Sequence, residues 1–180
     1  MSIRWSLLWI AAIALPGLAN QPADSARKRA RAAFTELSEE LQQRLQAAMQ
    51  QGGPARAVQV CRKEAPAIAA RVSKKHGFAV GRSSHRLRNP KNLQLGAIAD
   101  YLSRYAESPA EQVPVEAVPE GKGWLVIAPI PTRPLCLTCH GDPATFSADL
   151  RKELARGYPK DRATGFQVGQ LRGAFWARLK

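Results

Sequence analysis

The segment "RPLCLTCHGDP" places Cys136, Cys139 and His140 within five residues of one another. Cys-x-x-Cys-His is the attachment signature of a c-type haem: both thiols add to the porphyrin vinyl groups and the histidine ligates the iron. The two intervening residues let the chain bridge the two vinyl groups and place the next residue beneath the metal. We therefore predict one covalently attached haem c, with His140 as one axial ligand of its iron.

The same residues could instead form a redox dithiol or one half of a zinc site. A zinc site would need a second ligand pair, whereas Cys61, His76 and His85 are scattered without metal-ligand spacing. A thioredoxin-like dithiol would stand at a helix start within a βαβ unit, and the sequence pattern shows no such unit. The haem interpretation is therefore favoured.

Any strong second axial ligand must come from upstream, because no Met, His or Cys follows His140. This order differs from that of small electron-carrier cytochromes, which take a methionine from the C-terminal half. Cys61 is the odd cysteine once the motif pair is bonded, and the adjacent Arg62 and Lys63 would favour its thiolate. Spacing alone does not decide between Cys61 as a ligand and Cys61 as a buried apolar residue. The other possibilities are a five-coordinate iron or ligation by Met49, His76 or His85.

Residues 1–19 resemble an export signal. "MSIRW" supplies a positive end through Arg4, "SLLWIAAIALPG" is an apolar run, and "GLA" offers small residues before a cut after Ala19. The run is short for a membrane span, although an uncleaved anchor is the alternative. We expect cleavage, one domain over residues 20–180, a periplasmic or otherwise exported location, and no stable membrane span afterwards.

The chain is strongly basic, with 27 Lys and Arg against 14 Asp and Glu and a formal net charge of +13. Such a surface would suit an acidic redox or signalling partner protein. The run "RKRAR" at residues 27–31 could contact nucleic acid or lipid head groups, but a solvated helix face is the preferred interpretation. No nucleic-acid partner is expected.

Hydrophobic periodicity predicts helices before strands. An amphipathic helix is expected over residues 25–53, ending at Gly52-Gly53, and a second one over 54–77 with Cys61 on its inward stripe and a kink at Pro66. Further helices are expected over 93–106 and 143–157, and strands over 78–87, 124–130 and 173–179. Helices followed by strands without regular alternation favour an α+β fold.

Four segments together resemble the single-haem, c-type, PAS-like sensor family long catalogued as a domain of unknown function. They are "VCRKEAP" (60–66), "GRSSHRLRNPKN" (81–92), "PIPTRPLCLTCHGDP" (129–143) and "YPKDRATGFQVGQLRGAF" (158–175). The resemblance covers roughly residues 25–180, although the family's Asn-x-Pro continuation after the Arg-Asn-Pro turn is "NLQ" here.

The resemblance implies a PAS-like α+β domain, in which long N-terminal helices pack against an antiparallel sheet. It implies haem attachment through Cys136 and Cys139, with His140 as one axial ligand and, by position, Cys61 as the other. The residues that match the family's basic motif are assigned to the haem propionates or to holding the loop over the haem; they are Arg82, Arg86 and Arg88.

A histidine–thiolate iron would have a low reduction potential, because a thiolate stabilises the ferric state. Reduction would weaken the bond to Cys61, open a site for NO or CO and let the Cys61 helix move. We therefore expect an exported c-type haem protein for redox or diatomic-gas sensing, and not an enzyme. A periplasmic electron-transfer cytochrome c is the main alternative; a cytochrome c-prime-like helical bundle and a peroxidase are less favoured.

Overall fold

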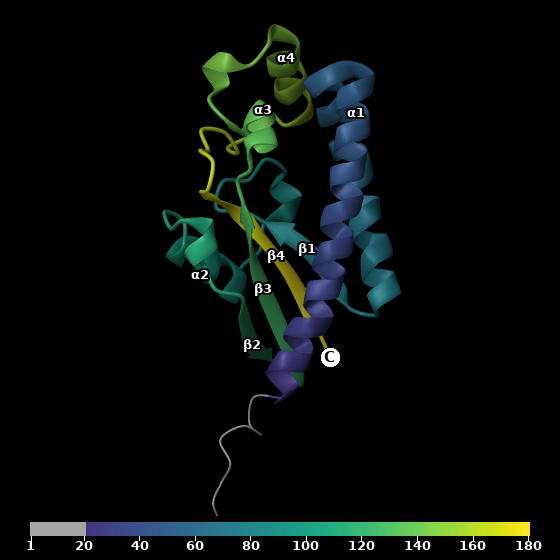
Figure 1. Ribbon diagram of the computed structural model, residues 1–180, viewed down its shortest axis with the longest axis vertical. Helices are drawn as coiled ribbons and strands as arrows, with labels where there is room; N and C mark the ends of the chain where they lie inside the picture. Colours follow the sequence, from purple (N-terminus) through teal and green to yellow (C-terminus); the bar gives the residue numbers. More distant parts are fainter. Residues whose placement is uncertain (1–20) are drawn as a thin grey trace, which may run out of the picture.

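The computed structural model describes residues 21–180. The described part begins with α1 (Gln21–His76), in which Gly52 and Gly53 have non-helical dihedral angles and divide the helix into two arms. Gly53 has a φ of 65°, in the left-handed region that favours glycine. The outgoing arm (21–51) and the returning arm (54–76) lie side by side (Figure 1). The break expected at the glycine pair is confirmed, whereas the expected export signal lies outside the described residues.

The sheet has four antiparallel strands in the order β1-β4-β3-β2. Its strands are β1 (Ala79–Ser83), β2 (Glu116–Glu120), β3 (Gly123–Pro131) and β4 (Leu171–Leu179). The C-terminal strand β4 lies between β1 and β3, so it joins the earliest strand to the β2–β3 hairpin. The α+β class expected from the sequence is confirmed.

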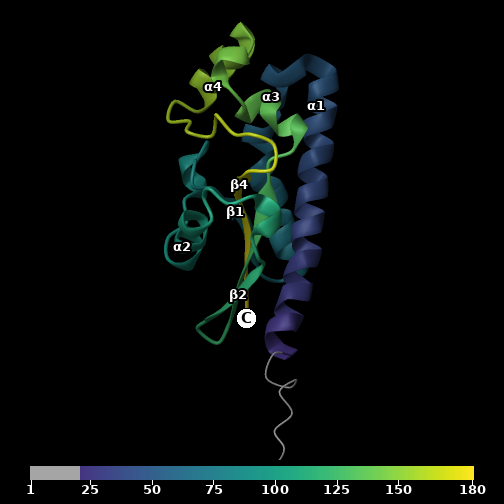
Figure 2. The ribbon, with the colours of Figure 1, turned by 60° about the vertical axis from the view of Figure 1, so that its left-hand side comes forward.

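Helices cover both faces of this sheet (Figure 2). Successive side chains of a strand point to opposite faces, so Val126 packs toward α1 while Leu125 and Ile127 pack toward α2 (Ala97–Arg104). Against α1 the core also contains Ala30, Ala33, Phe34, Leu37, Ile68, Val72 and Ala177. The expectation of long N-terminal helices packed on an antiparallel sheet is thus confirmed.

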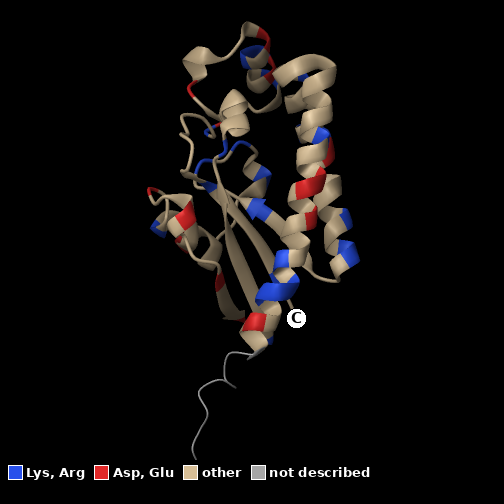
Figure 3. Ribbon diagram, viewed as in Figure 1, with Lys and Arg blue, Asp and Glu red and all other residues tan. Residues whose placement is uncertain are grey.

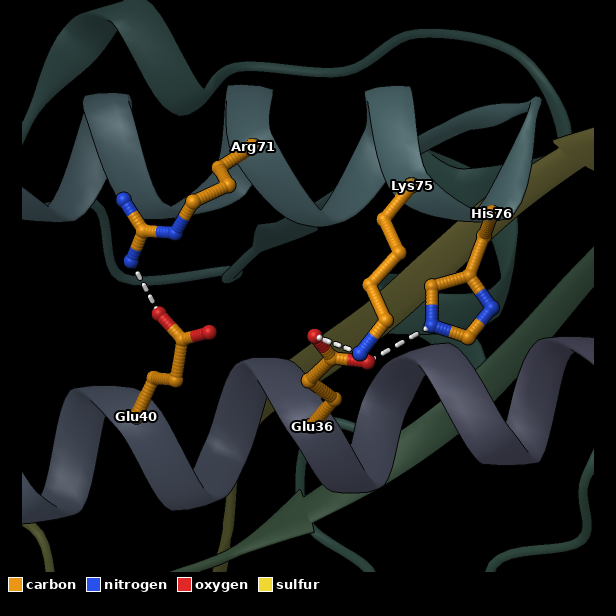
Figure 4. Close-up of polar contacts among 5 residues, drawn as sticks. All are labelled: Glu36, Glu40, Arg71, Lys75 and His76. Carbon is orange, nitrogen blue, oxygen red and sulfur yellow. Dashed lines mark hydrogen bonds and ion pairs between the residues drawn. The ribbon is translucent and has the colours of Figure 1, made fainter.

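Polar contacts join the two arms of α1 at the end of the hairpin away from its glycine turn (Figure 4). The carboxylate of Glu36 accepts from Lys75 Nζ at 2.8 Å and contacts His76 Nε2 at 2.9 Å, while Glu40 pairs with Arg71. His76, the last residue of α1, is half-buried in this contact. Exposed ion pairs contribute little stability individually, so we assign these contacts to aligning the arms.

The remaining elements form a cap beyond one end of the sheet, beside the turn of α1 (Figure 1). The cap contains α3 (Leu137–His140) and α4 (Ala148–Gly157). Ser147 caps α4, since its Oγ accepts from the Leu150 amide at 3.2 Å. Residues of α4 and Phe146 pack against Val58 of the returning arm. None of the helices within residues 21–180 combines the length and apolar character needed to cross a bilayer.

Candidate functional site

The Cys-x-x-Cys-His motif occupies two consecutive short helical turns of the cap. Cys136 ends the 3-10 turn η3 (Pro134–Cys136), and Cys139 and His140 end α3. The two cysteines are three residues apart on helical backbone, so their side chains lie on neighbouring positions of one face. Both are free thiols. This is the local geometry that attachment of one cofactor at two points requires.

His140 is held with one ring nitrogen engaged. Its Nδ1 lies 2.7 Å from the carbonyl oxygen of Ala163. A carbonyl only accepts, so Nδ1 carries the hydrogen and donates it, which leaves the Nε2 lone pair available. A backbone carbonyl commonly fixes a metal-ligating histidine in this way.

Burial keeps the His140 imidazole neutral. Burial is the largest cause that lowers the pKa of His140 well below its ordinary value of 6.5, and the positive charges of Arg172 and Arg88 act in the same direction. The hydrogen bond to Ala163 opposes them only in part. A neutral imidazole is the form that binds a metal ion.

The loop between α4 and β4 closes over α3. The amide of Gly165 donates to the carbonyl of Gly141 at 2.8 Å, and the amide of Phe166 donates to the carbonyl of His140 at 3.0 Å. The Phe166 ring lies between two histidines, with its centre 6.3 Å from that of His140 and 5.8 Å from that of His85. The position of His140 therefore depends on this loop, residues 158–170.

Arg88 connects this loop directly to the motif. Its Nε donates to Asp161 Oδ2 at 2.9 Å, and its Nη2 donates to the carbonyls of Cys139 and Ala163, the latter at 3.2 Å. The ion pair is largely shielded, since the side chains of Arg88 and Asp161 are only 13% and 12% exposed. Of the two roles expected for Arg88, these contacts favour holding the loop.

Arg86 also contacts this loop. Its Nη1 lies 3.3 Å from the carbonyl oxygens of both Thr164 and Gly165. Its guanidinium carbon lies 4.8 Å from the centre of the Phe166 ring, within the range of a cation–π contact. Arg86 therefore also acts on the loop.

The returning arm of α1 brings Cys61 to the motif. Val58, one turn earlier on that arm, belongs to the apolar cluster against which Cys139 packs. Burial raises the pKa of the Cys61 thiol, while the nearby Arg82 and Arg88 lower it. The pKa of Cys139 is likewise raised, first by burial and also by the proximity of Cys61. The structure thus brings the returning arm of α1 alongside the part of the cap that carries Cys139, and the charge of Arg82 acts on the Cys61 thiol.

The other upstream candidates lie in different surroundings. His76 contacts Glu36 at the opposite end of the returning arm. His85 lies beside the loop, and its Nδ1 is buried without a hydrogen-bond partner among the described residues. Met49 is half-buried near the end of the outgoing arm.

Two residues at the site were missed by sequence reasoning. Arg172 on β4 lies near Arg82, Cys61 and Cys136, and burial, followed by the charge of Arg82, lowers its pKa to about 10. Tyr158, at the C-cap of α4, has its pKa raised by burial and then by Cys61. Both residues lie in the family-like segment 158–175, which was the available signal, but only strand pairing and the packing of the cap bring them toward Cys61.

These residues fit a c-type haem chemically. The site offers two thiols on one helical turn, a neutral histidine with a free Nε2, a further sulfur from another element and several cations for carboxylates. A zinc site would need more grouped ligands, and within residues 21–180 no three His, Cys, Asp or Glu side chains are grouped as metal ligands.

Comparisons with known proteins agree with this fold. The family model described as "Tll0287-like: Tll0287" matches residues 19–179. The crystal structure of the cyanobacterial heme-protein Tll0287 aligns with a TM-score of 0.60 and 22% sequence identity, covering 88% of this chain and 96% of that chain. No curated protein matches the chain. The structural likeness confirms the PAS-like α+β fold, and the chain belongs to the Tll0287-like family.

Proposed function

We propose that the chain is an exported c-type haem protein. One haem would be attached through Cys136 and Cys139, with His140 and Cys61 as axial ligands of the iron. During attachment each thiol S–H adds across a vinyl C=C, forming a C–S bond and transferring its hydrogen to carbon, so no external oxidant is needed. The solved structure that matches this chain is described as a heme-protein, which supports the cofactor.

The observation that carries this proposal is the arrangement at His140. Its Nδ1 donates to the Ala163 carbonyl at 2.7 Å, so the free Nε2 is directed by a fixed hydrogen bond. Cys61 arrives from α1, a different element from the one that carries His140, and its sulfur is electrostatically coupled to Cys139. Two ligands from two separate elements suit a cofactor that lies between them.

Redox or diatomic-gas sensing is the role that we propose for this protein, without enzymatic turnover. A haem iron supplies one-electron chemistry and affinity for NO and CO. Cys61 would leave the iron on reduction and take up a proton, because burial favours the neutral thiol. Its departure would release the returning arm from the motif, which is the kind of two-state element that a sensor needs.

Periplasmic electron transfer is the second candidate. The formal net charge of +13 favours it, since a basic surface would steer an acidic redox partner. In this case Cys61 would stay on the iron in both oxidation states. An acidic signalling partner would suit the sensor equally well, so the charge of the chain alone does not separate the two roles.

Optical and EPR spectroscopy of the purified protein and of Cys61→Ala tests the ligand pair. We expect low-spin thiolate features in the ferric wild type and their loss in Cys61→Ala. Met49→Ala, which removes the other sulfur among the upstream candidates, should leave the spectrum unchanged. Identical spectra for the wild type and Cys61→Ala would remove Cys61 from the iron.

Addition of CO to the ferrous protein then separates the two roles. Binding of CO with loss of the thiolate features supports the sensor, whereas a six-coordinate ferrous iron that excludes CO supports electron transfer. Mass spectrometry of the protein from the periplasmic fraction tests export and attachment. It should show a chain that begins at Asn20 and carries the mass of one haem.

A further inference from the structure

We propose that Arg82 and Arg172 form a carboxylate-binding pair that holds the propionates of the haem, because strand pairing brings both guanidinium groups beside the cysteines without any acidic partner. This inference rests on the proposed haem function and adds Arg172 to the site. It also gives Arg82 a role different from that of Arg86 and Arg88.

The backbone fixes where both arginines stand. Arg82 is on β1, opposite Phe175 of β4, and Ser83 is opposite Ala174. Beyond that pairing, Ser84 Oγ donates to the carbonyl oxygen of Arg172 at 2.6 Å. The two arginines therefore project from adjacent strands at the end of the sheet that faces the cap.

Gly173 tightens this arrangement. A Cβ at this position would lie 2.3 Å from the carbonyl oxygen of Ser83, so β4 passes closer to β1 here than any side chain would permit. The residue before Gly173 is Arg172. The close approach thus sets the distance of Arg172 from the strand that carries Arg82.

The two guanidinium groups have no protein partner within residues 21–180. Neither of them donates a hydrogen bond to, or forms an ion pair with, any described residue. The neighbouring arginines do have partners. Arg86 donates hydrogen bonds to two carbonyls, and Arg88 donates to Asp161 and to two carbonyls. Both unpaired arginines are half-buried, so their N–H donors are available to a ligand.

Electrostatic coupling points to one shared anionic ligand. Arg82 lowers the pKa of Arg172, so the two charges oppose each other, and burial lowers the pKa of both. Both arginines also lower the pKa values of Cys61 and His140. An anion bound here would therefore lie next to the proposed iron ligands and the attachment cysteines.

The chemistry selects a carboxylate carried by the cofactor. Arginine binds carboxylates through two parallel N–H···O bonds, which gives the pair both strength and direction. A haem presents two carboxylates, one for each arginine. A free inorganic anion would satisfy the charge, but it would not account for the cysteines and the histidine near the two arginines.

The test compares two porphyrins on the full chain produced without haem. Iron protoporphyrin IX has free carboxylates, whereas its dimethyl ester has none and is otherwise the same. We expect the wild type to bind the free acid about tenfold to a hundredfold more tightly, as charge-assisted hydrogen bonds would provide. Arg82→Gln and Arg172→Gln should each reduce this preference about tenfold and leave the affinity for the ester unchanged.

Arg178→Gln is the matched control, since Arg178 is also on β4 but pairs with Glu120 at 3.1 Å. It should keep the wild-type preference. Equal affinity of the wild type for the two porphyrins would overturn the inference, whatever the variants do. So would retention of the full preference in both folded variants.

Failure of the proposed function has a different signature. The wild type would then bind neither porphyrin, and chain co-produced with the haem-attachment machinery would carry no covalent haem. Covalent haem together with indifference to the ester would overturn only the arginine pair.

Discussion

The sheet with its covering helices and the region toward the cap differ in the kind of side chain that they contain. Between α1 and α2 the buried residues are almost all apolar, and Leu37, Val72, Ile98 and Ile127 are fully buried. Toward the cap, basic residues gather on the segments between the sheet and α3 (Figure 3), and two guanidinium groups have no partner among the described residues.

Unsatisfied polar atoms follow the same division. Within residues 21–180, five buried side-chain atoms lack a hydrogen-bond partner, and those of Ser83, His85 and Thr132 lie at the ends of strands next to the cap or its loop. Buried polar atoms without partners cost free energy, so natural proteins keep few of them. The apolar region therefore supplies the stability, whereas the residues toward the cap leave buried polar atoms without partners.

Truncating the apolar core should have the largest effect. Leu37 is 0% exposed between α1 and the sheet, so Leu37→Ala should lower the free energy of unfolding by about 2–5 kcal/mol. Urea denaturation measures this change. Leu95→Ala is the control: Leu95 is 75% exposed, and its truncation should change stability by less than about 0.5 kcal/mol. Similar effects of the two variants would break the assignment of stability to this core.

Adding one methyl group at the boundary of the two regions should come next. Gly173→Ala would place a Cβ against the Ser83 carbonyl, and overpacking of this kind costs about 1–3 kcal/mol. Thermal unfolding gives the overall change, and hydrogen exchange should show loosened β1 amides. In the control Gly157→Ala, the new Cβ would first meet the flexible Arg62 side chain at 3.4 Å. That variant should be neutral or slightly stabilised; a loss equal to that of Gly173→Ala would contradict the close approach.

Cutting a contact inside the cap should loosen the cap alone. Arg88→Gln removes the ion pair with Asp161, and the loop over α3 should open with a local loss of about 1.5–3 kcal/mol. Hydrogen exchange at Arg162 and Phe166, whose amides bond to Leu87 and His140, reports this opening. Global unfolding in urea should change by less, because the apolar core is intact.

Arg104→Gln serves as its control, since Arg104 pairs with Glu116 at 2.9 Å away from the cap. It should leave loop exchange as in the wild type. If hydrogen exchange at the Arg162 and Phe166 amides were no faster in Arg88→Gln than in Arg104→Gln, the loop would not depend on Arg88.

The contacts between the α1 arms should give the smallest effect, visible through pH. Hydrogen bonds from Lys75 first, and then from His76, lower the pKa of Glu36 below its ordinary value of 4.5. A depressed carboxyl pKa contributes stability above the unfolded value, and this contribution is lost as the pH falls through the folded value. The wild type should therefore lose more thermal stability below pH 4.5 than Glu36→Gln does.

Glu39→Gln is the control on the same arm, since Glu39 is exposed and forms no ion pair within residues 21–180. Its acid profile should follow the wild type. An acid profile of Glu36→Gln indistinguishable from both would show that the arms are aligned by apolar packing alone.

Local patterns were sufficient for most of the fold. The glycine pair at 52–53, the apolar run at 124–130 and the alternation over 173–179 each predicted an element that the structure contains. Their signals are short-range, since a break needs two glycines and a strand needs period-two burial. The motif at 136–140 was equally local.

What the sequence left open depends on contacts between distant segments. Arg172 lies in the family-like segment 158–175, but its place next to Arg82 follows only from the insertion of β4 between β1 and β3. Likewise, spacing alone could not place Cys61 near Cys139, because their proximity requires the hairpin of α1 to turn back beside the cap. Nor could spacing pair His76 with Glu36, because Glu36 lies on the other arm of α1.

The hairpin of α1 has a mechanical consequence. Cys61 lies near the start of the returning arm and His76 ends it, with helical backbone between them, so at 1.5 Å per residue they are about 22 Å apart on one stiff rod. The rod is joined to the outgoing arm through Gly52 and Gly53, the two positions of α1 with non-helical dihedral angles, and the expected kink at Pro66 is not observed. A displacement at Cys61 would therefore turn the returning arm about this joint, and the arm would move farthest at its other end, where Lys75 and His76 contact Glu36.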